Sequence, residues 1–406
     1  MLNLIGYPEA LDLILRHMPA GAVESVPLLD TAGRILARDV VSQVDSPTAP
    51  SSLKDGYAVH SADLSAAGPD HPVALDLAGF YSAGDRPARP LLPGTAVRVT
   101  TGAALPPGAD AVLSGEYAQE RDGRVICRRD AGPGRNVLPR GADVKAGETI
   151  ARKGEQLRPA LIGLLAAAGL DQAAVAARLR VAVIGTGDEV VLPGRPLAPG
   201  QLYASNMVET AAWLEVFGQD VLTRLAGDRL EDLKEAVFGV RDLADAFITS
   251  GGAWGSDRDL VLNLMQNLGW QGLFHRVRLG PGKAAGFGLL FNKPFFILPG
   301  GPPSHEAAFL LLALPGLLAM GGRRDPAFPF RRARLTEAVQ GQPDWTKVIH
   351  ARLEFKADHF IAAPIKSISR LKSMAEKNGL VILPEGTGRV DQGAWVEVLD
   401  LNRPAG

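Results

Sequence analysis

The sequence predicts a multidomain protein of the α/β and β classes, in which a doubly wound, mainly parallel sheet forms the central domain. The first observation is the alternation of apolar strand patterns and amphipathic helix patterns over about 140 residues after Arg180. The second is the pattern of short β-type runs between Pro/Gly turns in 73–140 and again in 326–402. The third is the even spread of 46 Gly and 30 Pro along 406 residues, which indicates many turns and no disordered tail.

Composition indicates a soluble protein, which we expect in the cytoplasm. Hydrophobic residues make up 46% of the chain and charged residues 21%, and the formal net charge is −1. This charge, without Lys/Arg runs, argues against nucleic acid as a partner. No stretch approaches about 20 uninterrupted apolar residues and 1–21 lacks the pattern of a signal peptide, so we expect no membrane span. Cys127 is the only cysteine, which excludes an internal disulfide.

The first 180 residues predict a β module inserted into a helix-containing domain. A helix is expected over Tyr7–Met18, where apolar residues recur at helical spacing after Pro8. A second helix, Pro159–Ala168, is stopped at Gly169. Only β-type runs lie between 73 and 140, so the β module is expected to interrupt the helical domain.

From Arg180 the chain alternates strand and helix. Strands are expected at 181–186, 221–227, 246–250, 274–279, 286–291 and 294–301, and helices at 206–217, 229–240, 260–268 and 305–318. Asn206 and Glu209 are spaced as a capping box. Ligands of such sheets bind at the carboxyl ends of the strands. The following segment, 326–402, predicts a small β sandwich or barrel that is interrupted at 367–377.

The loop after the third predicted strand is the strongest candidate for a ligand site. The strand ends in Ser250, Gly251 and Gly252, and an amphipathic helix follows. Paired glycines let a ligand approach the backbone, and the helix start offers free N–H groups to an anion. Asp257 and Asp259 stand at the same place, which predicts a hard cation such as Mg²⁺ shared with a phosphate. A helix N-cap explains one of these two carboxylates equally well.

Other loops at the same sheet edge carry further candidates. Gly185–Glu189 completes neither a Walker A loop nor a GxGxxG motif, and its two acids suit a cation or a heterocycle. Asp228 has the Asp-x-x-Glu spacing of a helix N-cap as its alternative reading. Lys283 offers a positive charge to an oxyanion, with a solvated surface lysine as the alternative. Asp55, in an Asp-Gly turn, has a structural role in that turn as its alternative.

Ten short motifs occur in order over about 340 residues. They are GRILARDV (33–40), KDGYAV (54–59), TTGAALPPGADAVLSGE (100–116), GADVKAGE (141–148), VAVIGTGDEVV (181–191), GQLYASN (200–206), ITSGGAWGSDRD (248–259), PGK (281–283), LPGGP (298–302) and SRLKSM (369–374). In this combination the chain resembles the MoeA/gephyrin family of molybdopterin molybdenumtransferases. The resemblance covers nearly the whole chain.

The resemblance implies a domain organisation that agrees with the order of the patterns. It implies an elongated helical dimerisation domain over 1–45 and 141–178, an inserted β domain over 46–140, a molybdopterin-binding α/β domain similar to MogA and MoaB over 179–325, and a C-terminal β barrel over 326–406. It also implies a homodimer with the active site at the subunit interface, and a molybdopterin adenylyltransferase as a candidate partner.

The resemblance implies a reaction as well. Adenylylated molybdopterin and molybdate give molybdenum cofactor and AMP, with Mg²⁺ required. The family's functional acids fall on Asp55, Asp143, Glu189, Asp228 and Asp259, and its metal ligands on Glu189, Asp257 and Asp259. Pterin and oxyanion binding fall on Thr101, Thr186, Gly187, Ser250, Gly251, Gly252, Lys283, Pro299, Pro302 and Ser369.

The chain departs from the family pattern mainly around the oxyanion. GPGKA replaces the common KPGKP, which removes a lysine at Gly280, and LPGGP replaces LPGNP. Lys347 stands where an arginine is common, which removes bidentate geometry. Arg276, Arg278 and Lys54 are candidates to restore the lost charge, and a preference for tungstate is the alternative.

Two other functions stay open at this stage. One is a molybdopterin adenylyltransferase, an activity carried by a similar α/β domain. The other is a non-catalytic scaffold that binds the pterin and resembles gephyrin in its clustering role.

Overall fold

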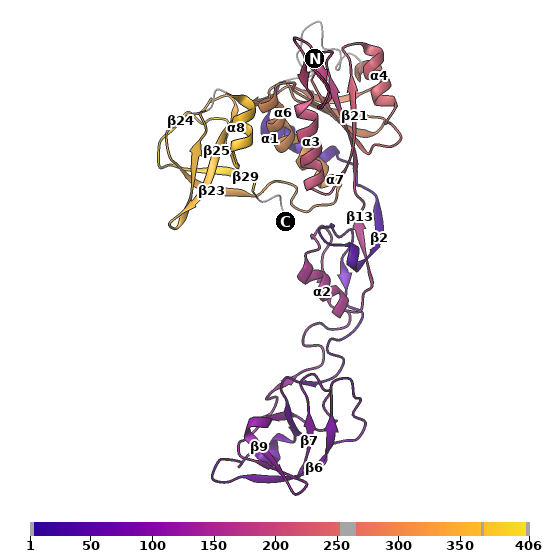
Figure 1. The fold of residues 1–406 in the computed structure, drawn as a ribbon, viewed down its shortest axis with the longest axis vertical. Coiled ribbons are helices and arrows are strands. Elements are labelled where there is room, and N and C mark those ends of the chain that lie inside the picture. The colour runs from indigo at the N-terminus through magenta and orange to yellow at the C-terminus, as the bar shows by residue number, and fades with distance from the viewer. Residues whose placement is uncertain (1–3, 252–264, 367–368, 403–406) are drawn as a thin grey trace.

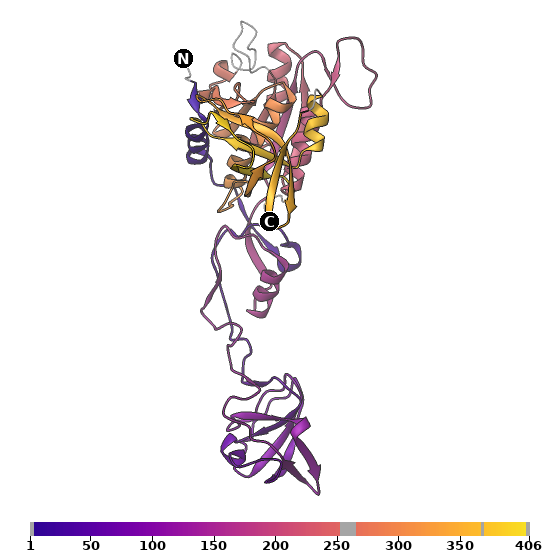
Figure 2. The same cartoon turned by 90° about the vertical axis from the view of Figure 1, so that its left-hand side faces the viewer.

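The computed structural model describes residues 4–251, 265–366 and 369–402. The molecule is elongated, with the α/β sheet and the C-terminal barrel side by side at one end and a separate β unit at the other (Figures 1 and 2). A thin region built from two passes of the chain joins the two ends. The ligand candidates are therefore distributed over both ends.

The α/β domain is a six-stranded sheet in the order β17-β14-β18-β22-β21-β19. Its first four strands are parallel, and β21 runs antiparallel to both of its neighbours, β22 and β19. The strands are β14 (Arg180–Thr186), β17 (Asp220–Ala226), β18 (Ala246–Ser250), β19 (Gln271–His275), β21 (Gly286–Leu290) and β22 (Lys293–Leu298).

Helices cover both faces of this sheet. Alternate residues of β14 point to opposite sides, so Val181 and Val183 join one hydrophobic core while Ala182 and Ile184 join the other. The first core packs against α1 (Tyr7–His17), α3 (Ser205–Val216), α6 (Pro302–Ala308) and α7 (Leu314–Met320), and the second against α4 (Leu230–Phe238). The doubly wound, mainly parallel arrangement predicted from the sequence is confirmed.

The helical run behind the sheet is long and apolar. Helices α6 and α7 are joined by a π-helical turn, η4 (Phe309–Ala313). Among the described helices, the continuous run Pro302–Met320 is the one whose length and hydropathy would suffice to cross a membrane, and 83% of it is buried inside the fold. Such burial is typical of a core helix.

The single strand predicted for 274–279 is wrong. It is divided at Arg276, whose φ of 88° breaks the extended backbone. β19 stays in the α/β sheet, whereas β20 (Val277–Gly280) pairs with β1 (Ile5–Gly6) and with a barrel strand. This switch joins the α/β domain to the barrel.

The C-terminal domain contains a closed five-stranded β barrel. The ring is β25-β26-β23-β29-β27, and β25 also pairs with β27 to close it. The strands are β23 (Phe330–Leu335), β25 (Thr346–Lys356), β26 (His359–Pro364), β27 (Gly379–Leu383) and β29 (Trp395–Asp400), with β24 (Val339–Gln340) and β28 (Arg389–Val390) paired beside them. Helix α8 (Arg370–Glu376) fills the predicted interruption.

The thin region, called the stalk below, is formed by short strand pairs and one helix. The pairs are β2 (Val23–Pro27) with β13 (Gln172–Ala176), β3 (Val40–Val41) with β12 (Thr149–Ala151) and β4 (Ser51–Ser52) with β11 (Val137–Leu138), and the helix is α2 (Pro159–Ala167). At its root the stalk meets the end of α7, where Gly21 N donates to Met320 O at 3.0 Å and Arg324 N donates to Gly154 O at 3.4 Å.

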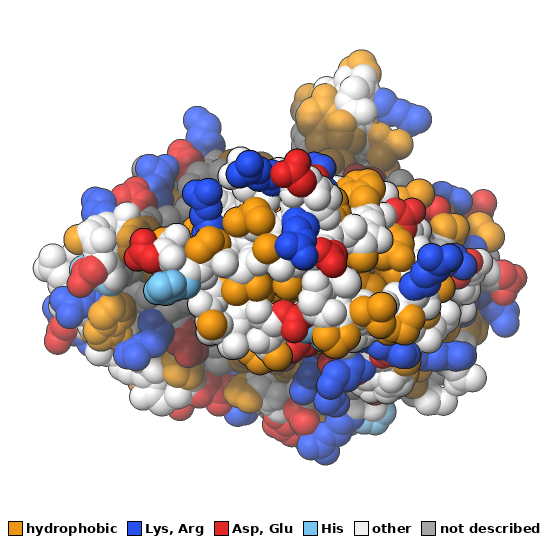
Figure 3. Space-filling view, turned by 90° about the horizontal axis from the view of Figure 1, so that it is seen from below, with side chains coloured by type: hydrophobic (Ala, Val, Ile, Leu, Met, Phe, Trp, Pro, Cys, Tyr) orange, Lys and Arg blue, Asp and Glu red, His pale blue; other side chains and the backbone are white. Residues whose placement is uncertain are grey.

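The far end is a six-stranded sheet in the order β8-β5-β7-β6-β10-β9. Its strands are β5 (Gly56–Val59), β6 (Val73–Tyr81), β7 (Thr95–Val99), β8 (Ala111–Ser114), β9 (Ala118–Arg121) and β10 (Arg124–Cys127). Cys127 lies in its core. Seen from this end, Lys/Arg, Asp/Glu and hydrophobic side chains are interspersed over the surface (Figure 3).

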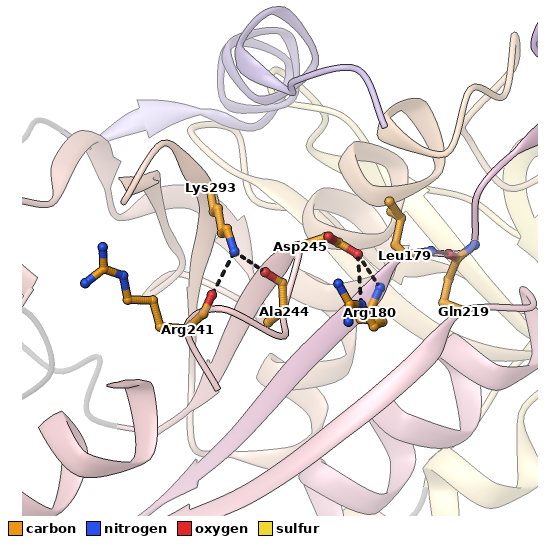
Figure 4. A network of polar contacts seen from close by, with 7 residues as sticks. All are labelled: Leu179, Arg180, Gln219, Arg241, Ala244, Asp245 and Lys293. Atoms are coloured by element: carbon orange, nitrogen blue, oxygen red, sulfur yellow. Dashed lines mark hydrogen bonds and ion pairs between the residues drawn. The ribbon is translucent and has the colours of Figure 1, made fainter. Parts of the chain in front are cut away.

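A polar network fixes the amino ends of the parallel strands (Figure 4). Lys293 Nζ, at the start of β22, donates to Arg241 O at 2.7 Å and to Ala244 O at 2.6 Å. Arg180 N, at the start of β14, donates to Asp245 Oδ2 at 2.8 Å. These bonds satisfy two loop carbonyls and the Arg180 N–H at the amino edge of the sheet, whereas ligands of such sheets bind at the opposite, carboxyl edge.

Candidate functional site

A cavity of about 770 Å³ opens at the carboxyl edge of the parallel strands. Seven predicted site residues line it, and they come from four separate loops: Thr186, Gly187, Glu189, Asp228, Ser250, Gly251 and Pro302. The short pair β15 (Val190–Val191) and β16 (Leu202–Tyr203) borders the same space. The topology thus brings together residues as far apart in sequence as Thr186 and Pro302.

Two glycines bring the backbone to the cavity surface. Gly251 has a φ of 112°, and a Cβ there would lie 2.5 Å from Thr186 Oγ1. Gly187 has a φ of 132°, and a Cβ there would lie 2.5 Å from Glu189 Oε2. Neither position accepts a side chain without strain, so a ligand can contact backbone here.

Asn206 links two segments of the cavity wall, the end of β18 and the loop at Gly300, by hydrogen bonds. The predicted capping box is wrong, because the residue preceding α3 is Ala204 and no side chain caps the helix. Instead Asn206 Nδ2 donates to Ser250 Oγ at 3.0 Å and to Gly300 O at 2.9 Å. The sequence motif GQLYASN located this residue but gave no sign of this contact.

Two helices begin at the cavity. The first residues of α3 line it, and so does Pro302 at the start of the helical run 302–320. The free N–H groups at the start of α3 favour an anionic ligand, as do the positive dipole ends of both helices. The run 302–320 offers only its dipole, because Pro302 and Pro303 lack an N–H and the next two N–H groups donate to Gly301 O.

The acidic side chains at this edge of the sheet are held in two ways: Asp188 and Asp228 bond to each other's loops, and Glu189 lies against Gly187. Asp228 and Asp188 face each other across two loops, since Asp228 N donates to Asp188 Oδ1 at 2.9 Å and Asp188 N donates to Asp228 Oδ2 at 3.5 Å. The alternative reading of Asp228 as a helix cap is wrong, because α4 has no side-chain cap. Glu189 folds over Gly187.

These acids fit Mg²⁺ only in part. Within the described residues no three His, Cys, Asp or Glu side chains gather closely enough to hold a metal. Glu189 and Asp228 do line one cavity, and Mg²⁺ characteristically keeps waters and takes one or two carboxylates together with a substrate phosphate. The donor set therefore fits a magnesium ion that arrives with a phosphorylated ligand. The predicted ligands Asp257 and Asp259, and Gly252, lie outside the described residues.

A second cavity of about 500 Å³ adjoins the first and shares Gly301 with it. Lys283 and Pro299 line this second cavity, together with Arg276. Lys283 Nζ lies 5.5 Å from the centre of the Trp345 ring, a cation–π arrangement. The two cations face a space that suits a small oxyanion.

The other candidate replacements for the missing lysine are placed elsewhere. Arg278 is paired with Glu385, with Nη2 3.0 Å and Nε 3.2 Å from Oε2. Lys54 lies in the loop that enters β5, at the far end of the molecule. Of the three, Arg276 is the one that shares a cavity with Lys283.

Asp55, Thr101 and Asp143 are remote from both cavities within one chain. Asp55 and Thr101 belong to the far β unit, and Asp143 lies in the stalk, between the pairs β4–β11 and β3–β12. The Asp55 carboxylate accepts hydrogen bonds from Thr101 N at 2.6 Å and from Thr101 Oγ1 at 2.9 Å. These bonds lower the pKa of Asp55, which is therefore charged at neutral pH.

The barrel supplies residues that sequence reasoning missed. Arg370 and Leu371 of α8 line the 770 Å³ cavity. Ser369, a predicted site residue, caps α8 and accepts a hydrogen bond from Lys372 N at 3.3 Å. The motif SRLKSM marked this segment, but only the fold shows which of its side chains reach the cavity.

Comparison with known proteins agrees with this architecture. The MoeA N-terminal region (domain I and II) matches residues 5–169, a probable molybdopterin binding domain matches 182–319, and the MoeA C-terminal region (domain IV) matches 332–401. The chain belongs to the MoeA family. This confirms the resemblance and the fold class predicted from the sequence.

Individual MoeA relatives match over nearly their whole length. A Mycobacterium tuberculosis protein named molybdopterin molybdenumtransferase 2 is 35% identical over 383 residues, which cover 93% of this chain and 95% of the relative. The Haemophilus influenzae molybdopterin molybdenumtransferase is 30% identical over 98% of this chain and 99% of the relative. The crystal structure of a Pyrococcus horikoshii MoeA protein superposes with a TM-score of 0.86 at 31% sequence identity. The match covers 98% of this chain and 99% of that protein. These names confirm the predicted enzyme class, a transferase of molybdenum cofactor biosynthesis.

Proposed function

We propose that this MoeA protein inserts molybdate into adenylylated molybdopterin and releases AMP in a Mg²⁺-dependent reaction. The observation that carries the proposal is the pair of adjoining cavities, one lined by carboxylates, glycine backbone and helix starts, the other by Lys283 and Arg276. A phosphorylated pterin suits the first and a tetrahedral oxyanion the second.

In the first cavity, backbone at Gly187 and Gly251 borders the pterin, and Thr186 and Ser250 offer hydroxyl groups. Glu189 and Asp228 line this cavity. In this proposal they would hold the magnesium ion together with Asp257 and Asp259. When bound, Mg²⁺ neutralises charge on the phosphoanhydride as AMP leaves.

In the second cavity, Lys283 and Arg276 hold molybdate by charge-assisted hydrogen bonds. Pro299 and Pro302 stiffen the loop between the two cavities and keep them at a fixed separation. Two Mo–S bonds form at the dithiolene sulfurs, and one molybdate oxygen leaves as water with the two thiol protons. A water molecule cleaves the phosphoanhydride P–O bond, so that AMP leaves and the pterin keeps its own phosphate.

Asp55, Thr101 and Asp143 act, in this proposal, from the far end of a second copy of the chain. The protein would be a homodimer whose dimerisation domain is 1–45 with 141–178, and whose other domains are 46–140, 179–325 and 326–406. Ser369 would support the cavity through α8. We further propose a cytoplasmic enzyme that receives its substrate from a molybdopterin adenylyltransferase, with no membrane or nucleic-acid partner.

The test is AMP release from adenylylated molybdopterin by the full-length protein, with Mg²⁺ and either molybdate or tungstate. The proposal expects AMP release that depends on Mg²⁺ and on molybdate. Saturation by tungstate alone would identify a tungstate insertase instead. Binding of the pterin without AMP release under either oxyanion would identify a scaffold, and adenylylation of molybdopterin by ATP without a partner would identify an adenylyltransferase.

A further inference from the structure

The C-terminal barrel contributes a cation to the cavity of the α/β domain. Arg370, the first residue of α8, lines this cavity. In the described part of the chain no hydrogen bond or ion pair engages its guanidinium group. The other charged residues lining the cavity are Glu189 and Asp228, so Arg370 is the lining group that attracts an anion directly.

The chemistry of this side chain selects the kind of anion. A guanidinium group presents a planar set of N–H donors that matches two phosphate oxygens at once. The cavity it lines is the one with the glycine backbone and the helix starts, whereas Lys283 lines the neighbouring cavity. A phosphate group of the larger ligand therefore fits Arg370 better than the free oxyanion does.

A buried ion pair fixes the helix that carries Arg370. Lys377, which follows α8, has its Nζ 2.6 Å from Glu306 Oε1 of α6 and donates to Met374 O at 3.0 Å. The Lys377 and Glu306 side chains are only 2% and 3% exposed. Because α6 begins at the cavity with Pro302, this pair sets the position of α8 against the cavity wall.

A second acid, Glu209 of α3, faces the same pair. Burial, and then the charge of Glu306, raise the pKa of Glu209 to about 8, while Lys377 opposes that shift. Glu209 accordingly retains its proton at pH 7. His350 faces Lys377 from β25, and burial lowers the pKa of His350 to about 4, so it adds no charge.

We propose that Arg370 binds a phosphate group of the pterin substrate, and that the buried cluster of Glu209, Glu306 and Lys377 positions α8 for this contact. The inference rests on the function proposed above and names a contact within that site. The barrel is then a part of the binding site, joined to it through a charged cluster inside the molecule.

The first experiment measures the dissociation constant of adenylylated molybdopterin by calorimetry, on the full-length protein without molybdate. Arg370→Gln is expected to weaken binding about 10- to 100-fold, the usual effect of losing hydrogen bonds to a charged group. Arg370→Lys should lose less affinity than Arg370→Gln, since lysine keeps the positive charge but not the planar set of N–H donors. Lys372→Gln, which removes an exposed cation of the same helix, is the matched control and should bind like the wild type.

Two outcomes overturn the assignment of Arg370. Wild-type affinity in Arg370→Gln would remove it from the site. A change confined to the KM for molybdate in the AMP-release assay would assign Arg370 to the oxyanion. If the wild-type protein binds adenylylated molybdopterin but releases no AMP, the proposed function fails while the binding role of Arg370 is still measured.

The second experiment tests the buried cluster. Lys377→Met alone leaves the buried Glu306 side chain without its partner, so the double variant Glu306→Gln/Lys377→Met is used to keep the protein folded. It should bind the pterin as weakly as Arg370→Gln does, and adding Arg370→Gln to it should weaken binding by less than about twofold more. Two results would show that the cluster does not position Arg370. One is wild-type pterin affinity in the double variant, and the other is a loss of affinity in the triple variant equal to the product of the two separate losses.

Discussion

At the scale of single residues, the glycine at the end of β18 is the most sensitive position of the cavity. Gly251→Ala places a Cβ 2.5 Å from Thr186 Oγ1 at a φ of 112°. We expect a cost of about 1–3 kcal/mol in the free energy of unfolding and loss of pterin binding. Urea unfolding and calorimetric titration with molybdopterin measure the two effects.

Gly194→Ala is the control for that substitution. Gly194 also has a positive φ, of 88°, but a Cβ there meets no atom within 4 Å. It therefore shares the backbone strain without the contact to Thr186, and its pterin affinity should stay at the wild-type value. Equal loss of pterin binding in both variants would show that strain, and not the close approach at Thr186, explains the effect.

Lys283 gives a second prediction at this scale. Lys283→Gln should raise the KM for molybdate about tenfold, as expected when a charge-assisted hydrogen bond to an oxyanion is lost. The dissociation constant for the pterin should not change, because Lys283 lines the second cavity and not the first. Steady-state AMP release at varied molybdate provides the KM, and a proportional loss of pterin affinity would contradict the separation of the two cavities.

Individual side-chain contacts are where the sequence was least informative. Arg278 and Arg276 have the same charge and are separated by one residue, yet one is paired with Glu385 and the other lines the oxyanion cavity. Asn206 carried the spacing of a cap and instead joins β18 to the Gly300 loop. Such choices depend on partners brought close by the tertiary fold, which local spacing does not encode.

At the scale of elements, the strand and helix alternation was predictable because each pattern reflects burial on one face or on two. The glycine-rich strand ends were predictable for the same reason, and the fold does gather seven of the predicted residues in one cavity. The division of 274–279 into β19 and β20 was not predictable from the sequence, since it depends on one residue, Arg276, in a left-handed conformation. The contribution of α8 to the cavity depends on the packing of two domains and leaves no local pattern.

The packing of α3, α6 and α8 also predicts a dependence of stability on pH. The pKa of Glu209 rises from 4.5 to about 8 on folding, so the folded state retains a proton that the unfolded state releases. The contribution of this group is complete below about pH 4.5 and is lost as the pH rises through about 8. The free energy of unfolding of the wild type should fall across this range relative to Glu209→Gln, which cannot titrate. Urea unfolding of both proteins from pH 5 to pH 9 tests it, and parallel curves would contradict the assignment.

At the scale of the whole molecule, the separation of Asp55 from Asp228 predicts that two subunits share each site. Mixing Asp55→Asn and Asp228→Asn proteins under conditions that exchange subunits should restore about a quarter of the wild-type AMP release, since half of the dimers are mixed and each has one intact site. Each variant alone should be inactive. No recovery in mixed dimers whose formation is verified by mass would place both acids in the same subunit's site.

The stalk has a mechanical consequence. It meets the body at a narrow root, through backbone contacts at Gly21 and Gly154, and holds the far β unit at its tip. Because the stalk is long, a rotation of a few degrees at its root would displace the far β unit by a distance that grows with the length of the stalk. We therefore expect that any bending at the root would move the far unit as one body, because its two hydrophobic clusters lie wholly inside it.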